Sequence, residues 1–184
     1  MVSILEKMKK NLRHDESPSA LAAVAIILYP RGEDFLILFV KRAIKASDPW
    51  SGDMAFPGGK KHVSDERLMD TVFRETMEET GIDLRGSHFL GMLNEMDSNV
   101  RKGMLVQPFI FLSESLPEVV LNDELCAYFW IPISELEKSR CRANIRGLEV
   151  PGFKIGGDVV WGLTYRMVEN LITIINEVRG NLAC

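Results

Sequence analysis

The segment that most restricts how this chain can fold is Arg74-Glu75-Thr76-Met77-Glu78-Glu79-Thr80-Gly81-Ile82. Its three glutamates, Glu75, Glu78 and Glu79, fall within five positions, and on a helix they project from neighbouring positions on one side. Like charges at this spacing repel by roughly 0.2–0.5 kcal/mol per pair. We therefore expect a helix that carries these acids for a reason other than its own stability.

The expected helix begins after Ser64 and ends at Gly81. Ser64 is a residue type that caps helix N-termini, and Val63 and Leu68 have the spacing of a hydrophobic staple. Gly81 suits a left-handed C-cap. The face expected to be buried consists of Leu68, Val72, Phe73 and Thr76.

The acidic face has two interpretations, a divalent metal site and an ordinary solvated surface. Hard divalent cations prefer carboxylate oxygens, and no His or Cys adjoins Glu75, Glu78 or Glu79 in sequence, so Mg²⁺ or Mn²⁺ fits better than Zn²⁺. Arg74 is expected to hold Glu78, four residues later, along the helix. The preceding Phe56-Pro57-Gly58-Gly59 favours the metal site, because glycines let the backbone approach closely and offer a carbonyl ligand.

Together the two segments resemble the signature of the Nudix hydrolases, a glycine loop followed by a helix reading Arg-Glu-hydrophobic-x-Glu-Glu-x-Gly-hydrophobic. The loop from Gly59 to Arg74 is one residue longer than that pattern, which leaves Glu66 or Asp65 as its first acid. Thr76 stands where an aliphatic residue is usual. The residues that match are Arg74, Glu75, Glu78, Glu79, Gly81 and Ile82.

The resemblance implies an enzyme that hydrolyses the diphosphate linkage of a nucleoside diphosphate derivative. It implies that Mg²⁺ or Mn²⁺ is held by Gly59, Glu75, Glu78 and Glu79, and that catalysis uses Arg74, Glu78, Glu79 and Glu124. For Glu124, in a loop well after the helix, an ordinary turn residue is the alternative.

The substrate is suggested by the loop before the helix. Gly52 and Phe56, ahead of Pro57-Gly58-Gly59, are similar to coenzyme A pyrophosphatases, although Asp48 stands where that subgroup has an arginine. This favours coenzyme A or its acyl derivatives. The alternatives are an NTP or ADP-ribose type of Nudix pyrophosphatase, and a Nudix sensor that binds a nucleotide without cutting it.

Cationic side chains near the expected site are candidates for substrate phosphate. We expect Lys41, Arg42, Lys60 and Arg101 to bind substrate; for Lys60 and Arg101 a solvated surface position is the alternative. Trp50 can stack on a base or pack on its own loop, and we favour packing. Trp161 is expected in the core.

The pattern of elements predicts an α+β fold. Two apolar strands at 20–29 and 35–42 precede the acidic helix, and further strands are expected at 89–95, 104–112, 119–121, 127–131, 153–155 and 159–161. Helices are expected at 3–13, 132–138 and 163–178. The resemblance implies a Nudix-type α/β/α sandwich with a mixed β-sheet, in a domain at 19–184 after an N-terminal helical extension at 1–18.

Composition limits the partners. The net charge of -4 argues against a nucleic-acid binder, and the longest apolar run, Ala20 to Tyr29, is about half the length that spans a bilayer. Three widely spaced cysteines suit a reducing cytoplasm. The basic, amphipathic N-terminal helix is expected to dock on its own domain or on a partner subunit rather than on a membrane, which leaves a homodimer open.

Overall fold

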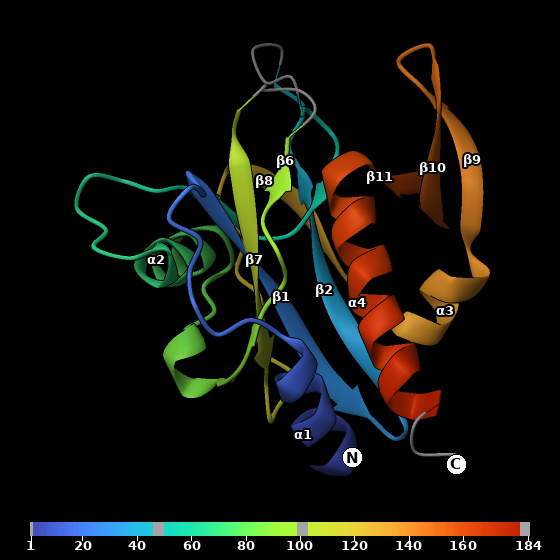
Figure 1. Ribbon diagram of the computed structural model, residues 1–184. Coiled ribbons are helices and arrows are strands. Elements are labelled where there is room, and N and C mark those ends of the chain that lie inside the picture. The colour runs from blue at the N-terminus through green and yellow to red at the C-terminus, as the bar shows by residue number, and fades with distance from the viewer. Residues whose placement is uncertain (1, 46–49, 99–102, 181–184) are drawn as a thin grey trace.

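A computed structural model of the protein describes residues 2–45, 50–98 and 103–180. In these ranges the chain forms one eight-stranded mixed sheet and one three-stranded sheet (Figure 1). The helices are α1 (Val2–Asn11), α2 (Leu68–Thr80), α3 (Ile133–Lys138) and α4 (Gly162–Gly180), with a 3-10 turn at Leu84–Gly86. The strands are β1 (Ala22–Arg31), β2 (Asp34–Arg42), β3 (Met54–Ala55), β4 (Gly58–Lys60), β5 (His88–Met92), β6 (Met96–Asp97), β7 (Leu105–Leu112), β8 (Leu125–Pro132), β9 (Arg140–Ile145), β10 (Leu148–Ile155) and β11 (Asp158–Trp161).

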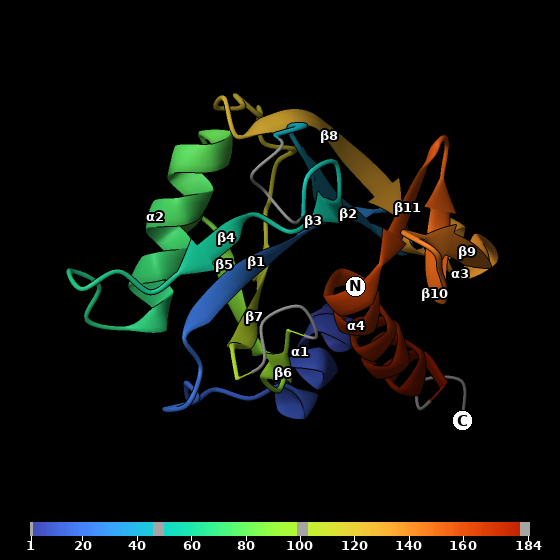
Figure 2. The same ribbon diagram turned by 90° about the horizontal axis from the view of Figure 1, so that it is seen from above.

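The large sheet is mixed, because β1 runs parallel to β7 and antiparallel to β2 and β4. Its main path is β3-β2-β1-β7-β5, while β8 pairs with β2 and β6 with β7. The expected α+β fold with an α/β/α sandwich is confirmed: α2 covers one face of the sheet, and α1 and α4 cover the other (Figure 2).

Two hydrophobic cores follow from the alternation of side chains along the central strands. In β1, Ala23, Ala25 and Ile27 face α2, while Ile26 and Leu28 face α4. The core under α2 is small, and the core under α1 and α4 is larger and extends to Phe153 and Val160 of the small sheet. The central sheet is therefore buried on both faces.

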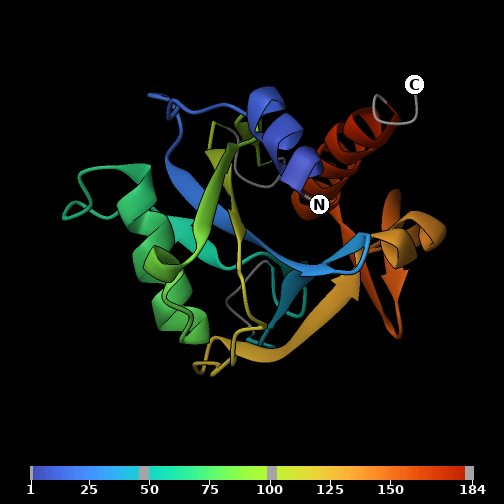
Figure 3. The ribbon, with the colours of Figure 1, turned by 90° about the horizontal axis from the view of Figure 1, so that it is seen from below.

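The N-terminal helix α1 packs against α4 and β5 of its own chain (Figure 3). Met8 and Leu12 are buried there. The segment after it returns to the other face, where Glu16 accepts hydrogen bonds from the backbone N–H groups of Leu68 (2.8 Å) and Met69 (3.1 Å) at the start of α2. No helix within the described ranges has the length and apolar character needed to cross a membrane.

The expected start of the acidic helix was wrong, and its expected end is confirmed. The helix begins at Leu68 rather than after Ser64, and Val63 is 98% exposed, so there is no staple. The distant carboxylate of Glu16 satisfies the first amides instead, which local sequence does not reveal. At the other end Gly81 adopts the left-handed conformation, with φ 70°.

Other elements differ from expectation in the irregular parts of the chain. Residues 119–121 form no strand, although Val120 donates its N–H to the carbonyl of Thr80. Residues 43–61, where no helix or strand was expected, contain β3 and β4 within their described part. Strand β9 was not expected, because its side chains alternate between exposed and partly exposed and give little apolar pattern.

Candidate active site

The three glutamates of α2 differ in how far they reach into the protein. Glu79 is 5% exposed and lies on the same helical stripe as Leu68, Val72 and Thr76. The side chain of Glu75 is 20% exposed and that of Glu78 57%. The acidic face therefore runs from the core to solvent, and one of its carboxylates occupies a core position.

The buried Glu79 accepts a hydrogen bond of 2.8 Å from the backbone N–H of Gly58 in β4. The pKa of Glu79 is raised to about 7, mainly by burial and in smaller part by the negative charges of Glu75 and Glu124. The Gly58 N–H and the positive charge of Arg42 act in the opposite direction. A carboxylate in this position would be stabilised by an added positive charge.

Gly59 lies directly against the carboxylate of Glu75. A Cβ atom at position 59 would come within 2.6 Å of the Glu75 carboxyl carbon and 2.7 Å of Oε1. Glycine at this position allows the backbone of β4 to lie against the carboxylate without displacing it. The two glycines therefore bring the peptide groups of β4 to two glutamates of α2.

Arg74 organises the charges along the same helix. Its guanidinium donates to Glu75 (2.7 Å) and to Glu78 (3.3 Å), and the second contact confirms the pairing expected along the helix. It also binds Asp65 through Nε (3.3 Å) and Nη2 (3.0 Å). The guanidinium, the His62 N–H and the Thr71 hydroxyl hold the pKa of the buried Asp65 far below its usual range.

The two acids that precede the helix, Asp65 and Glu66, make different contacts. Asp65 is buried and bound to Arg74, whereas Glu66 is exposed and accepts a bond from Lys61 only through its backbone carbonyl. The inserted residue lies in the loop before α2 and leaves the acidic face intact.

The fit of a divalent cation can be tested on the donor groups themselves. In the ranges the structure describes, no three His, Cys, Asp or Glu side chains converge as a ready-made metal-binding set, because Arg74 takes up Glu75 and Glu78. The donor groups nevertheless suit a hard cation, because they are all oxygens. Glu79 is buried near other negative charges, and the backbone of Gly59, which has no side chain, lies against Glu75. The residues present therefore fit Mg²⁺ or Mn²⁺.

The structure brings two of the other expected residues to the glutamates. Arg42 ends β2, and its charge acts on Glu79. Glu124 follows in the loop before β8, where its carbonyl accepts the N–H of Ala43 (2.8 Å) and its charge also acts on Glu79. The neighbouring Asn122 donates its N–H to the carbonyl of Glu79 at 3.2 Å.

The remaining expected cations lie elsewhere or are not described. Lys41 alternates with Arg42 on β2 and binds Asp158 of β11 at 2.7 Å, so the structure does not bring it to the glutamates. Lys60 is exposed beside the site, and its carbonyl accepts from Arg74 at 3.4 Å. Arg101 and Asp48 lie outside the described residues.

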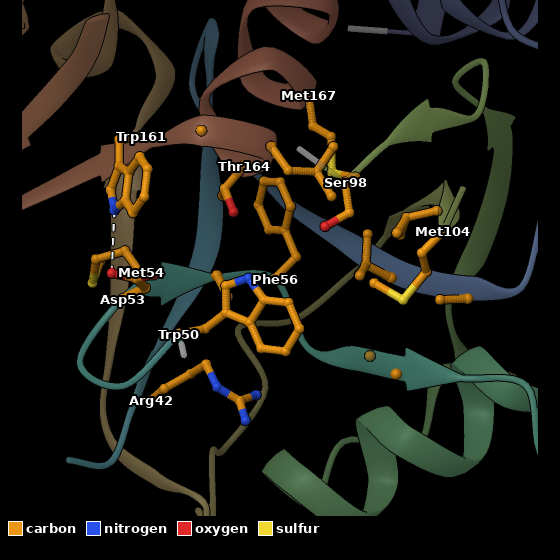
Figure 4. A pocket seen from close by; sticks show the side chains of 18 of the residues that line it. Arg42, Trp50, Asp53, Met54, Phe56, Ser98, Met104, Trp161, Thr164 and Met167 are labelled. Carbon is orange, nitrogen blue, oxygen red and sulfur yellow. Dashed lines mark hydrogen bonds between the residues drawn. The ribbon is translucent and has the colours of Figure 1, made fainter. Parts of the chain in front are cut away.

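A pocket of about 290 Å³ lies beside β4, whose Gly58 and Gly59 contact the glutamates (Figure 4). Arg42, Gly58 and Gly59 contribute to its lining, and most of the rest is apolar or aromatic. Trp50 points into this pocket rather than only onto its own loop. The other lining residues are Ala22, Val24, Asp53, Met54, Ala55, Phe56, Lys60, Ser98, Met104, Val106, Trp161, Gly162, Leu163, Thr164 and Met167.

The expectation that Trp161 is a core residue was wrong. Trp161 is partly exposed and forms part of the pocket wall, where its Nε1–H donates to Asp53 at 3.2 Å (Figure 4). It comes directly before α4, at the end of a short strand, and a buried strand gives the same apolar pattern in sequence. Only the three-dimensional arrangement of β11 and β3 reveals it.

The chain combines a sheet between helices with a carboxylate helix and a glycine strand beside a pocket, which is the arrangement that the Nudix resemblance implies. Known proteins agree. Residues 19–148 match the NUDIX domain family. The NudL Nudix hydrolase of Yersinia enterocolitica is 30% identical over 168 residues, covering 84% of this chain and 81% of that protein.

Other relatives and folds are also similar. The human mitochondrial coenzyme A diphosphatase NUDT8 is 26% identical, over 86% of this chain and 70% of that protein. A Schizosaccharomyces pombe protein, C14C4.10c, is 31% identical, but the chain spans 46% of its length. The solved Nudix hydrolase RenU of M. smegmatis has the same fold, with a TM-score of 0.61 at 14% identity over 86% of this chain and 87% of that one.

The chain therefore belongs to the Nudix family and is a pyrophosphohydrolase. The resemblance inferred from Gly59 and Arg74 to Ile82 is confirmed by a match that covers most of the chain.

Proposed function

We propose that the protein hydrolyses the diphosphate linkage of a nucleoside diphosphate derivative, with coenzyme A or its acyl derivatives as the preferred substrates and Mg²⁺ or Mn²⁺ as the cofactor. The observation that carries the proposal is the junction of α2 and β4. There, Glu79 is buried on the Gly58 N–H, Glu75 lies on Gly59, and the pocket that contains Arg42 begins.

In this proposal Glu75, Glu78 and Glu79 hold the cation together with the carbonyl of Gly59. The cation, when bound, offsets charge on the phosphoryl oxygens and lowers the pKa of a bound water. Arg74 keeps Glu75 and Glu78 beside each other and is itself fixed by Asp65. Glu79 is fixed by the Gly58 N–H, so its orientation does not depend on the ligand.

Two residues outside α2 act on the substrate. Arg42 binds a phosphate group, because its guanidinium lines the pocket next to Gly58 and Gly59 and already influences the charge of Glu79. Glu124 accepts the proton of the attacking water, since it is exposed beside the site and its charge acts on Glu79. Lys60 adds a positive charge at the edge of the pocket.

The pocket receives the organic part of the substrate. Trp50 and Phe56 offer aromatic surfaces to a planar base, and Met104 and Met167 can adapt to its shape (Figure 4). The similarity to a coenzyme A diphosphatase and the Gly52–Phe56 spacing favour coenzyme A. A nucleotide sensor without turnover is the second candidate, and the complete set of glutamates counts against it.

The proposal is tested with a panel of coenzyme A, ADP-ribose, NADH, dinucleoside polyphosphates and NTPs, each with Mg²⁺ or Mn²⁺ and with products resolved by mass. We expect release of 3′,5′-ADP from coenzyme A, whereas a preference for NTPs would exclude the coenzyme A assignment. Glu79→Gln should keep the fold and abolish turnover. The matched control is Glu177→Gln, because Glu177 is an exposed helix glutamate on α4, across the sheet from α2.

Normal turnover in Glu79→Gln would overturn the site assignment. The small-molecule substrate, a cytoplasmic location and a homodimer stay predictions from the sequence.

A further inference from the structure

The hairpin of β9 and β10 ends in a turn with an unusual residue. Ile145 pairs with Leu148, so the turn consists of Arg146 and Gly147, with φ of 53° and 84°. Arg146 is the one non-glycine residue with positive φ in the part of the chain that the structure describes. Such turns favour Asn or Gly at this position, and an L side chain there costs about 1–2 kcal/mol. The hairpin would fold more easily with another residue, so the arginine calls for an explanation in terms of its contacts.

The guanidinium of Arg146 reaches the wall of the pocket. Its Nη2 lies 3.2 Å from both carboxylate oxygens of Asp53, and its Cζ lies 5.4 Å from the centre of the Trp161 ring. Trp161 donates its Nε1–H to the same carboxylate at 3.2 Å. Arg146, Asp53 and Trp161 therefore form one contact set, which joins the hairpin tip to two pocket-lining residues from separate segments of the chain.

Asp53 also connects this set to the strand that carries Arg42. The carbonyl of Asp53 accepts the N–H of Arg42 at 3.1 Å, and its own N–H donates to the carbonyl of Trp50 at 3.0 Å. A movement of Asp53 would therefore shift the backbone of both Trp50 and Arg42. Arg146 at the hairpin tip lies 93 residues after Asp53 in sequence. The Arg146 side chain is 47% exposed despite these contacts.

We propose that Arg146 is a positioning residue that sets the affinity of the pocket for the nucleoside part of the substrate, an inference that rests on the proposed function. It does so in two ways. Its guanidinium, which contacts the carboxylate through Nη2, offsets the negative charge of Asp53 that would otherwise repel an anionic ligand, and its face supports the Trp161 ring that forms the wall. Arg146 does not touch the glutamates, so it affects binding rather than the chemical step.

The decisive variant is Arg146→Gly, because glycine removes the guanidinium while it relieves the positive φ, and the hairpin is preserved. Arg146→Lys keeps the charge but loses the planar guanidinium that stacks on Trp161. The matched control is Arg142→Ala in β9 of the same hairpin, where Arg142 pairs with Glu149 across the strands and is exposed. All variants are first compared by thermal unfolding.

Two measurements are made on each variant: KM and kcat for the best substrate of the panel, and the Kd of ADP with Mg²⁺ by calorimetry. We expect Arg146→Gly to raise KM and Kd about tenfold, which corresponds to about 1.4 kcal/mol, with kcat within about twofold of wild type. Arg146→Lys should recover part of the loss, and Arg142→Ala should behave as wild type. In the Asp53→Asn background, Arg146→Gly should weaken binding less than it does in the wild-type background, because there is no carboxylate charge left to offset.

Results other than these would contradict either the role of Arg146 or the proposed function, and they distinguish the two. Unchanged KM and Kd in Arg146→Gly, a fall in kcat alone, or additive effects with Asp53→Asn would overturn the role of Arg146. Wild-type protein that binds ADP but cleaves no substrate would overturn the proposed hydrolysis, and Arg146 would then be judged from Kd alone. Wild-type protein that binds no ADP would overturn the pocket assignment and the inference with it.

Discussion

The two adjacent glycines of β4 permit a sharp test, because an added methyl group meets different obstacles at each. At Gly59 the Cβ would come within 2.6–2.8 Å of the Glu75 carboxylate, which is the far end of a flexible side chain. The Gly59 backbone is not among the positive-φ glycines. In Gly59→Ala the carboxylate must therefore move while the strand stays.

At Gly58 the obstacle is rigid. A Cβ there would lie 2.3 Å from the carbonyl oxygen of Ala23 and 2.6 Å from the Cα of Val24, both in the backbone of β1, and φ is +147°. Two strands would have to separate, so we expect Gly58→Ala to lower the free energy of unfolding by about 3 kcal/mol or more. Gly59→Ala should change it by no more than about 1 kcal/mol.

The effect of Gly59→Ala should appear in function. Displacing one carboxylate of a catalytic site by about 1 Å costs on the order of 100-fold in rate, so we expect kcat/KM to fall by about that factor and Mn²⁺ binding to weaken. Urea unfolding, Mn²⁺ calorimetry and steady-state kinetics measure the three quantities. Full activity and Mn²⁺ affinity in Gly59→Ala, or unfolding as ready as that of Gly58→Ala, would refute this prediction.

Two further predictions concern stability. Glu16→Ala should lower the free energy of unfolding by about 1 kcal/mol, because the first amides of α2 lose their acceptor; no change in urea unfolding would contradict the capping role. In metal-free protein, folding raises the pKa of Glu79 from 4.5 to about 7. The protonated carboxyl therefore adds to the free energy of unfolding below pH 4.5, and this contribution is lost as the pH rises through about 7. Wild type should therefore lose about 3 kcal/mol relative to Glu79→Gln between pH 4.5 and 8 in EDTA, whereas a difference that does not vary with pH would exclude the buried carboxyl as its source.

The sequence predicted the parts of the molecule whose information is local. The C-terminal end of α2 at Gly81, the Arg74–Glu78 pair and the strands β1, β2 and β7 follow from turn chemistry, helical spacing and apolar runs. The approach of the glycine strand to the acidic helix was also expected, because the two segments together match a family pattern.

Distant contacts explain what the sequence did not predict. The carboxylate that accepts the first two amides of α2 belongs to Glu16, 52 residues before Leu68, whereas the sequence pointed to Ser64 as the cap. The pocket wall combines Trp161 with Asp53, 108 residues apart, and a tryptophan in an apolar strand reads as core. Lys41 and Arg42 are equivalent in sequence, and only the pleat of β2 sends one to Asp158 and the other to the glutamates.

Because Glu79 lies in the buried stripe of α2, the residue that the proposed activity needs also lowers the stability of the fold. Its neighbours along the stripe are Leu68, Val72 and Thr76, so an uncharged or apolar side chain of similar length would suit the position better than an ionised carboxylate does. A single substitution of Glu79 by such a residue would then abolish turnover and raise the free energy of unfolding. A descendant of this chain that needed only to recognise a nucleotide could discard catalysis at this position and become more stable by doing so.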